Sequence, residues 1–124
     1  MKIITPDFTS YSDFFDETAI YRYKAGDHIF HSGDAGDCMY VIMEGQVQVE
    51  AGGRRQVIME KGDVLGEMAV IDNAARSADA KAVTDCRLAA IDDYAFRFLI
   101  EKVPDFSHDL LRVLAIRLRA MNTI

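Results

Sequence analysis

Four residues between positions 66 and 77 have the types and the spacing of an anion-binding site. Gly66 allows a tight turn into a short helix that begins at Glu67. The first turn of a helix leaves backbone N–H groups unpaired and carries a partial positive charge. Arg76 adds a guanidinium whose paired donors match phosphate oxygens, and Ser77 adds a hydroxyl. The stretch therefore predicts that a removable anion, such as a phosphate group, binds between this helix and Arg76.

Two neighbouring features bear on the rest of this site. Glu67 has the wrong charge for a phosphate, but its carboxylate is suited to accept a hydrogen bond from a sugar hydroxyl. The strand that follows Arg76 places Ala78, Ala80 and Ala82 on one face, and the amide of Ala78 is a further donor. These small side chains leave room either for a ligand or for large side chains of an opposing sheet, and both interpretations stay open.

The elements that must position these residues are mainly strands. All eight glycines lie between Gly26 and Gly66, where they separate short runs rich in β-branched and aromatic residues. A two-residue hairpin is expected at Gly52-Gly53, after a strand whose side chains alternate between apolar and polar. This pattern predicts a mainly β fold, an antiparallel roll of the jelly-roll type. The expected strands cover residues 28–30, 38–43, 46–51, 54–60, 77–83 and 86–92.

Helices are expected at the two ends of this roll. Asp92 or Asp93 would cap a helix that Pro104 ends, and a second helix runs from Asp105 to the last residue. The N-terminal segment reads as a short irregular or helical lead-in. One domain is therefore expected, with a lead-in over residues 1–22, a roll over 23–92 and C-terminal helices over 93–124.

Composition and charge argue against several classes of protein. The chain has 124 residues and a formal net charge of −6, which gives it no general attraction for nucleic acid. It has no apolar run of about 20 residues and no signal peptide at its start, so we expect a cytoplasmic protein without a membrane partner. Cys38 and Cys86 are single and far apart, which indicates buried free thiols and not a metal or redox pair.

Two stretches resemble one known family. GDVLGEMAVIDNAARSADAKA, residues 62–82, is similar to the phosphate-binding cassette of cyclic nucleotide-binding domains, with its Gly-Glu-apolar-Ala opening, short helix and Arg followed by small residues. AGDHIFHSGDAGDCMYVIMEGQVQV, residues 25–49, looks like the first strands of that family. The resemblance runs from about Tyr23 to the C-terminus. It implies a sensor domain of the cAMP receptor protein or protein kinase A regulatory subunit type, with a cyclic nucleotide as ligand, without cofactor, metal or catalytic residues.

The resemblance also implies roles for the residues of the cassette. Arg76 would pair with the exocyclic oxygens of the cyclic phosphate, Ser77 would add a hydroxyl contact, and Glu67 would bind the ribose 2′-hydroxyl. Ser77 favours cAMP over cGMP, because family members tuned for cGMP often carry threonine there. The backbone amides that would face the phosphate are those of Gly66, Met68 and Ala69.

The base of the nucleotide would lie between the roll and the C-terminal helix. Val49 would form part of the wall near the base, and Met121 or Asn122 would cover it. Arg117 falls within an apolar stripe of the helix, where it either reaches Glu67 or the phosphate, or snorkels to water at an exposed helix end. A homodimer or an effector protein would bind through the same helix.

The sequence is also compatible with two alternatives to a cyclic nucleotide sensor. In the first, the fold no longer binds nucleotide and serves as an interaction or dimerisation module, with Arg76 paired to Glu67 or to an aspartate. In the second, His28, His31 and Glu44 form the metal site of a cupin-like enzyme. The spacing argues against the second alternative, because the histidines lie three apart and no later histidine completes the set.

The C-terminal helix reaches the last residue, Ile124. Bacterial transcription activators with this sensor continue through a longer helix into a helix-turn-helix domain. The chain is therefore either a stand-alone sensor without a helix-turn-helix domain or a fragment of a longer protein, and both interpretations stay open.

Overall fold

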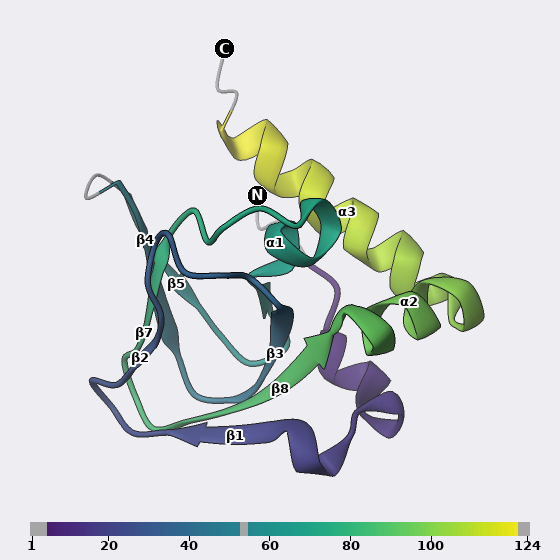
Figure 1. The fold of residues 1–124 in the computed structure, drawn as a ribbon, viewed down its shortest axis with the longest axis horizontal. Coiled ribbons are helices and arrows are strands. Elements are labelled where there is room, and N and C mark those ends of the chain that lie inside the picture. The colour runs from purple at the N-terminus through teal and green to yellow at the C-terminus, as the bar shows by residue number, and fades with distance from the viewer. Residues whose placement is uncertain (1–4, 53–54, 122–124) are drawn as a thin grey trace.

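A computed structural model describes residues 5–52 and 55–121 (Figure 1). It contains two four-stranded sheets, with strand orders β1-β8-β3-β6 and β2-β7-β4-β5, and all pairings are antiparallel. The predicted antiparallel roll is therefore confirmed. The strands are β1 (Ile20–Tyr23), β2 (His28–Phe30), β3 (Cys38–Glu44), β4 (Val47–Ala51), β5 (Arg55–Met59), β6 (Val64–Leu65), β7 (Asp79–Ala82) and β8 (Cys86–Asp92).

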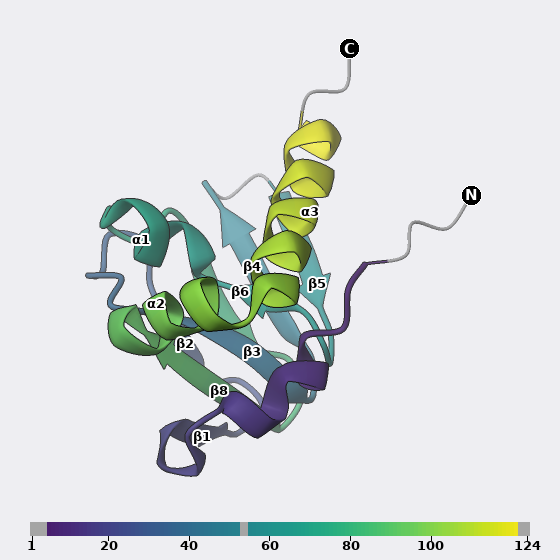
Figure 2. The same ribbon diagram turned by 90° about the vertical axis from the view of Figure 1, so that its right-hand side faces the viewer.

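Three α-helices and two 3₁₀-helices complete the fold. Helices α2 and α3 lie across one side of the sheet that contains β3 and β8 (Figure 2). The side chain of Asp92 caps α2 by accepting a hydrogen bond from the amide of Ala95 at 2.9 Å. The helices are η1 (Phe8–Phe14), η2 (Glu17–Ala19), α1 (Glu67–Asp72), α2 (Asp93–Lys102) and α3 (Pro104–Met121).

The structure differs from the prediction most clearly at the start of the roll, at one short strand and at the start of α3. The roll begins earlier than residue 23, because β1 starts at Ile20 and pairs with β8 through Ala89. Strand β6 was not predicted, since two residues carry no recognisable alternation. Helix α3 starts at Pro104, whose fixed φ and missing N–H suit the first position of a helix. At the expected hairpin, Gly52 has a φ of 63°, while Gly53 lies outside the described residues.

Two apolar clusters lie on the two faces of the β1-β8-β3-β6 sheet. Met39 and Val41 pack with η1, α2 and α3, whereas Ile42 and Tyr40 pack against the second sheet. Strand β3 therefore has both faces covered, which explains why its sequence CMYVIM is a continuous apolar run without polar alternation.

The alanines of β7 mostly serve packing. Ala80 and Ala82 are buried in the cluster between the sheets, and Ala80 lies opposite Phe30 on one side and Val49 on the other. Large side chains of the facing sheet thus fill the space beside these two alanines, which supports the packing interpretation for them. Only Ala78, just before β7, lines the cavity described below.

Both cysteines are buried and free, as predicted. Burial raises the pKa of the Cys38 thiol and of the Cys86 thiol above their ordinary value. Within residues 5–52 and 55–121, no helix combines the length and the apolar character needed to cross a membrane.

Candidate functional site

The site begins at the turn from β6 into α1. Gly66 has a φ of 74°, in the left-handed region that favours glycine. A Cβ atom at this position would collide with Nη1 of Arg76 and would lie 3.5 Å from the ring of Phe30. Glycine is therefore required at position 66 both by the turn and by the close approach of the Arg76 guanidinium.

Arg76 is buried, with 5% of its surface exposed, and donates hydrogen bonds to backbone carbonyls. Its Nη1 donates to the carbonyl of Gly66 at 2.9 Å, and its Nη2 donates to the carbonyl of Cys38 at 2.6 Å. The guanidinium also lies over the ring of Phe30, with 4.3 Å between Cζ and the ring centroid.

The positive charge of Arg76 has no counter-ion in the part of the chain that the structure describes. None of the three ion pairs there involves Arg76, and its buried Nε has no hydrogen-bond partner. A buried cation is costly unless an anion compensates it. The arrangement therefore favours binding of an anion, and the pairing of Arg76 with Glu67 or an aspartate, which the alternative without nucleotide predicted, is not found among the described residues.

Glu67 is also buried, but Arg117 of α3 neutralises it. Nη1 of Arg117 donates to Oε1 of Glu67 at 2.6 Å, and Nη2 donates to the carbonyl of Val64 at 2.6 Å. Arg117 thus reaches Glu67, as one of the two interpretations predicted, and does not snorkel to water. The contact joins the last third of α3 to the first residue of α1.

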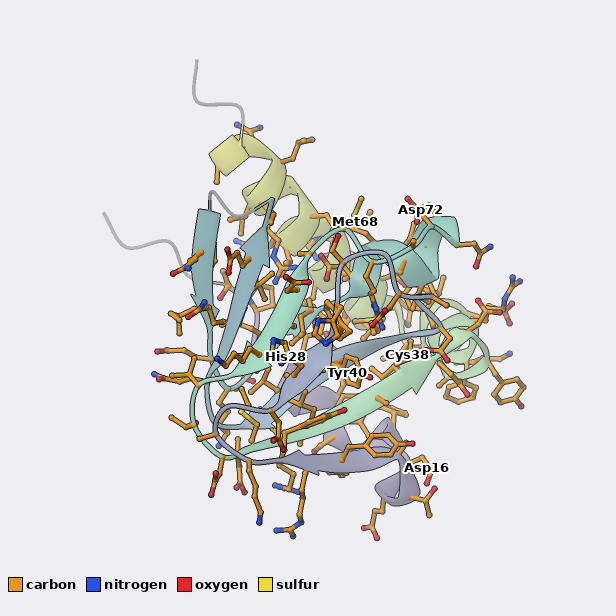
Figure 3. The ribbon with its side chains drawn as sticks, turned by 60° about the vertical axis from the view of Figure 1, so that its left-hand side comes forward. Asp16, His28, Cys38, Tyr40, Met68 and Asp72 are labelled. Atoms are coloured by element: carbon orange, nitrogen blue, oxygen red, sulfur yellow. The ribbon has the colours of Figure 1, made fainter. Side chains whose placement is uncertain are left out.

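A cavity of about 130 Å³ lies between α1, the loop that follows it and α3. Each predicted ligand-binding residue except one lines this cavity: Val49, Gly66, Glu67, Met68, Ala69, Arg76, Ser77, Ala78 and Arg117. The exception is Met121, whose side chain, like Asn122, lies outside the described residues. Met68, one of the lining residues, is labelled in Figure 3, where it lies above Tyr40.

The cavity also has lining residues that the sequence did not indicate. Phe30, Met59, Leu65 and Ala75 belong to it. Phe30 is the most informative, because its ring supports Arg76 and its strand pairs with the alanine strand β7. The sequence signal that would have identified Phe30 is a large aromatic residue on a strand that pairs with a strand of small residues.

The volume of the cavity has a structural consequence. Ligand pockets usually enclose about 300–1,000 Å³. A cavity of about 130 Å³ is smaller than this range, so it encloses only part of a ligand of nucleotide size.

Asp79 does not line the cavity. Its side chain accepts a hydrogen bond from the amide of Ser32 at 2.6 Å and is not among the lining residues of the cavity. No carboxylate from β7 therefore repels an anion beside Arg76.

The residues of the cupin alternative do not converge. The rings of His28 and His31 stack on each other with 4.4 Å between their centroids, and Glu44 pairs with Arg87 at 3.1 Å. Among residues 5–52 and 55–121, no three histidine, cysteine or carboxylate side chains are grouped as a metal site would require.

Comparison with known families covers both the fold and the cassette in a single match. The family model for the cyclic nucleotide-binding domain matches residues 20–103. The chain belongs to the cyclic nucleotide-binding domain family. The matched range begins at the first residue of β1 and includes both sheets, α1 and the whole cassette.

Relatives of this family include transcriptional regulators. The chain is 35% identical over 108 residues to a CRP-like cAMP-activated global transcriptional regulator of Mycobacterium tuberculosis, which covers 81% of this chain and 47% of the relative. The crystal structure of the catabolite activator protein of Thermus thermophilus is 31% identical, with a TM-score of 0.80, and covers 96% of this chain and 57% of that chain. The chain thus spans about half the length of these relatives.

A third relative has been solved with two different ligands. The EAL enzyme Bd1971 in its cAMP-bound form is 34% identical with a TM-score of 0.61, over 82% of this chain and 29% of that chain. Its cGMP-bound form is 35% identical with a TM-score of 0.62, over 81% of this chain and 28% of that chain.

Proposed function

We propose that this chain is a non-catalytic sensor domain that binds a cyclic nucleotide, with cAMP favoured over cGMP, and relays occupancy through α3. The observation that carries the proposal is the buried guanidinium of Arg76, which is held by two carbonyls and has no carboxylate partner in the described residues. A cyclic phosphate supplies the missing negative charge without bringing a second ionisable proton into the site.

Each part of the nucleotide then has a partner in the cavity. The cyclic phosphate lies against Arg76, within reach of the Ser77 hydroxyl and of the amides at the start of α1. Glu67 accepts a hydrogen bond from the ribose 2′-hydroxyl, and Val49 contributes an apolar wall toward the base. These residues bind and orient the ligand, and no bond of the ligand is broken.

The preference for cAMP rests on Ser77, which lacks the methyl group of the threonine common in cGMP-tuned members. The relatives from M. tuberculosis and T. thermophilus are described as cAMP-activated and as a cyclic AMP receptor protein. Bd1971, however, has been solved with either nucleotide. A side-by-side titration with cAMP and cGMP is therefore part of the test.

Relay through α3 rests on the Glu67–Arg117 contact. Glu67 is both the residue proposed to bind the ribose and the residue that holds α3 through Arg117. Entry of the ribose hydroxyl adds a competitor for this carboxylate, so occupancy changes how α3 is held, in the manner of a two-state switch. We propose that a partner of a cytoplasmic sensor reads this change in α3.

A second candidate function is an interaction or dimerisation module that binds no nucleotide. The observation in its favour is the outer face of α3, where Leu111 is 67% exposed and Leu118 is 59% exposed. These two residues are seven apart and therefore lie on one face of the helix, where a twin subunit or an effector protein would cover them.

The test is calorimetric titration of the chain with cAMP and with cGMP. We expect heat of binding at a stoichiometry near one for cAMP, and weaker binding for cGMP. Arg76→Ala should abolish detectable binding, because it removes the buried cation proposed to face the phosphate, whereas Arg119→Ala on the exposed part of α3 should bind as the unchanged chain does.

Thermal unfolding provides the control for folding in the same samples. A ligand at about 100 times its dissociation constant should add about 2.7 kcal/mol to the stability of the unchanged chain and nothing to Arg76→Ala. Unchanged affinity in a folded Arg76→Ala variant would contradict the site. Absence of heat with both nucleotides in the unchanged chain would leave the interaction module as the function.

A further inference from the structure

A groove of about 600 Å³ lies away from the Arg76 cavity and shares no lining residue with it. It lies where the lead-in passes along the ends of β1 and β8 and the start of α2, and it has not been used in the proposed function. Its position can be followed in Figure 3, where Cys38 and Tyr40 lie on one side of β8 and Asp16 lies on the other.

Aromatic side chains line this groove, and four of them are largely exposed. Tyr94 is 82% exposed, Phe14 and Tyr21 are each 50% exposed, and Phe98 is 46% exposed. Folded monomers rarely leave several large aromatic side chains together in water. Tyrosine and phenylalanine are, by contrast, enriched in the buried centres of protein interfaces. The groove therefore has the composition of a docking surface.

The charge of the groove is entirely negative. Asp16, Asp37 and Asp92 line it, and no lysine, arginine or histidine is among its described lining residues. None of the three carboxylates takes part in an ion pair within residues 5–52 and 55–121. Hydrogen bonds from the backbone and side chain of Thr18 hold the pKa of Asp16 below its ordinary value, so this carboxylate stays ionised.

The three carboxylates are distributed over separate elements. Asp16 caps η2, Asp37 precedes β3, and Asp92 joins β8 to α2. Aromatic faces attract cations, and carboxylates accept charge-assisted hydrogen bonds from guanidinium and ammonium groups. Because the three charges come from separate elements and most of the other lining residues are aromatic or aliphatic, the complement of the groove is a chain that carries several cations with apolar side chains between them.

We propose that this groove docks a basic peptide segment of a partner protein, in which arginine or lysine residues alternate with aliphatic residues. The exposed aromatic side chains of the groove cover the aliphatic side chains of the peptide, and the three aspartates pair with its basic ones. The groove has no residue in common with the nucleotide cavity, so this proposal does not depend on nucleotide binding.

The test uses a fluorescein-labelled peptide, acetyl-Leu-Arg-Leu-Arg-Leu-Arg-amide, titrated with the full chain and followed by fluorescence anisotropy. A second readout is intrinsic, because four of the five tyrosines line the groove and the chain contains no tryptophan. We expect saturable binding of the arginine peptide together with a change in tyrosine emission, and no binding of a matched peptide with glutamate in place of arginine.

Matched variants separate docking from general attraction to a chain of net charge −6. Asp16→Asn and Asp72→Asn each remove one negative charge, and both side chains keep an acceptor for their local backbone amide. Only Asp16 lies in the groove, so Asp16→Asn should weaken the peptide by about fivefold, whereas Asp72→Asn should leave it unchanged. Phe98→Ser should weaken it by about tenfold, and Leu111→Ser on α3 should have no effect.

Four outcomes would overturn the proposal. They are equal weakening by Asp16→Asn and Asp72→Asn, equal binding of the glutamate peptide, full competition by free spermine at the concentration of the peptide, and self-association of the chain that Phe98→Ser abolishes. The first two would indicate non-specific contact, the third a site for a small organic cation, and the fourth a contact between two copies of this chain.

Discussion

Gly66 and Arg76 determine each other's position. The left-handed turn at Gly66 removes the Cβ that would otherwise occupy the space of Arg76 Nη1, and Nη1 in return donates to the Gly66 carbonyl. The guanidinium is therefore oriented by the backbone itself, which leaves its charge available to a ligand.

This relation predicts a difference between two glycine substitutions. Gly66→Ala should lower the free energy of unfolding by about 2–3 kcal/mol, because it combines left-handed strain with displacement of Arg76. Gly52→Ala has a similar φ but no atom within 4 Å of the added Cβ, so it should cost only about 1 kcal/mol. Urea unfolding measures both, and calorimetry with cAMP should detect weakened binding only in Gly66→Ala. Equal losses of stability in Gly66→Ala and Gly52→Ala would show that the Arg76 guanidinium moves aside without an energetic cost.

Helix α3 is held at two levels along its length. Near its start, Phe106 and Leu110 are buried in the cluster with η1 and α2. Near its end, Arg117 binds Glu67 and the carbonyl of Val64. The second attachment is polar and lies at the cavity, so it is the one that a ligand can alter.

Two ion pairs of the chain provide a matched test of this attachment. Arg117→Met leaves Glu67 buried without a cation, so we expect a loss of about 2–3 kcal/mol in the unfolding free energy of the ligand-free chain. Arg97→Met breaks an exposed pair with Asp93 at 2.9 Å and should cost no more than about 0.5 kcal/mol. Hydrogen exchange should also rise in the last turns of α3 in Arg117→Met alone. Similar stabilities in the two variants would mean that Arg117 does not hold the helix.

The elements differ in how well the sequence predicted them. Strands with glycine at their ends and a run of β-branched or aromatic residues, such as β2 and β3, have the predicted positions, since local signals determine them. Strands β1 and β6 were not predicted, because β1 exists through its pairing with β8 and β6 is only two residues long. Arg76 and Glu67 were recognisable from the cassette. Their partners come from distant parts of the chain, the Cys38 carbonyl for Arg76 and Arg117 of α3 for Glu67, and no local pattern encodes these contacts.

At the scale of the molecule, two residues of β3 connect the acidic groove with Arg76. Cys38 and Tyr40 line the groove, while the Cys38 carbonyl accepts from Arg76 and the Tyr40 ring lies 5.8 Å from its Cζ. Residues of β3 therefore line the groove and also contact Arg76, although none of them lines the Arg76 cavity itself.

Buried tyrosines predict how the stability of the whole molecule depends on alkaline pH. Burial raises the pKa of Tyr11 and of Tyr40 well above the ordinary value near 10, and hydrogen bonds to Asp109 and Cys38, respectively, raise it further. Above pH ~10 the unfolded chain loses these protons while the folded chain keeps them. The free energy of unfolding should therefore fall as pH rises, by up to about 1.4 kcal/mol per pH unit for each tyrosine.

Urea unfolding between about pH 8 and pH 11 measures this slope. The buried thiols contribute in the same direction from about pH 8.5, since burial raises their pKa as well. Tyr11→Phe should reduce the slope above pH ~10, whereas Tyr94→Phe, at an 82% exposed position, should leave it unchanged. Identical slopes in the unchanged chain and in Tyr11→Phe would contradict the assignment.

Because both native thiols are buried, the chain can be labelled selectively at a new cysteine without first replacing Cys38 and Cys86. Cys38 and Cys86 are 9% and 5% exposed, and their raised pKa values keep them as unreactive thiols near neutral pH. A maleimide dye would therefore attach to a new cysteine on the outer face of α3, such as Leu118→Cys, and report the movement of that helix in an otherwise native protein.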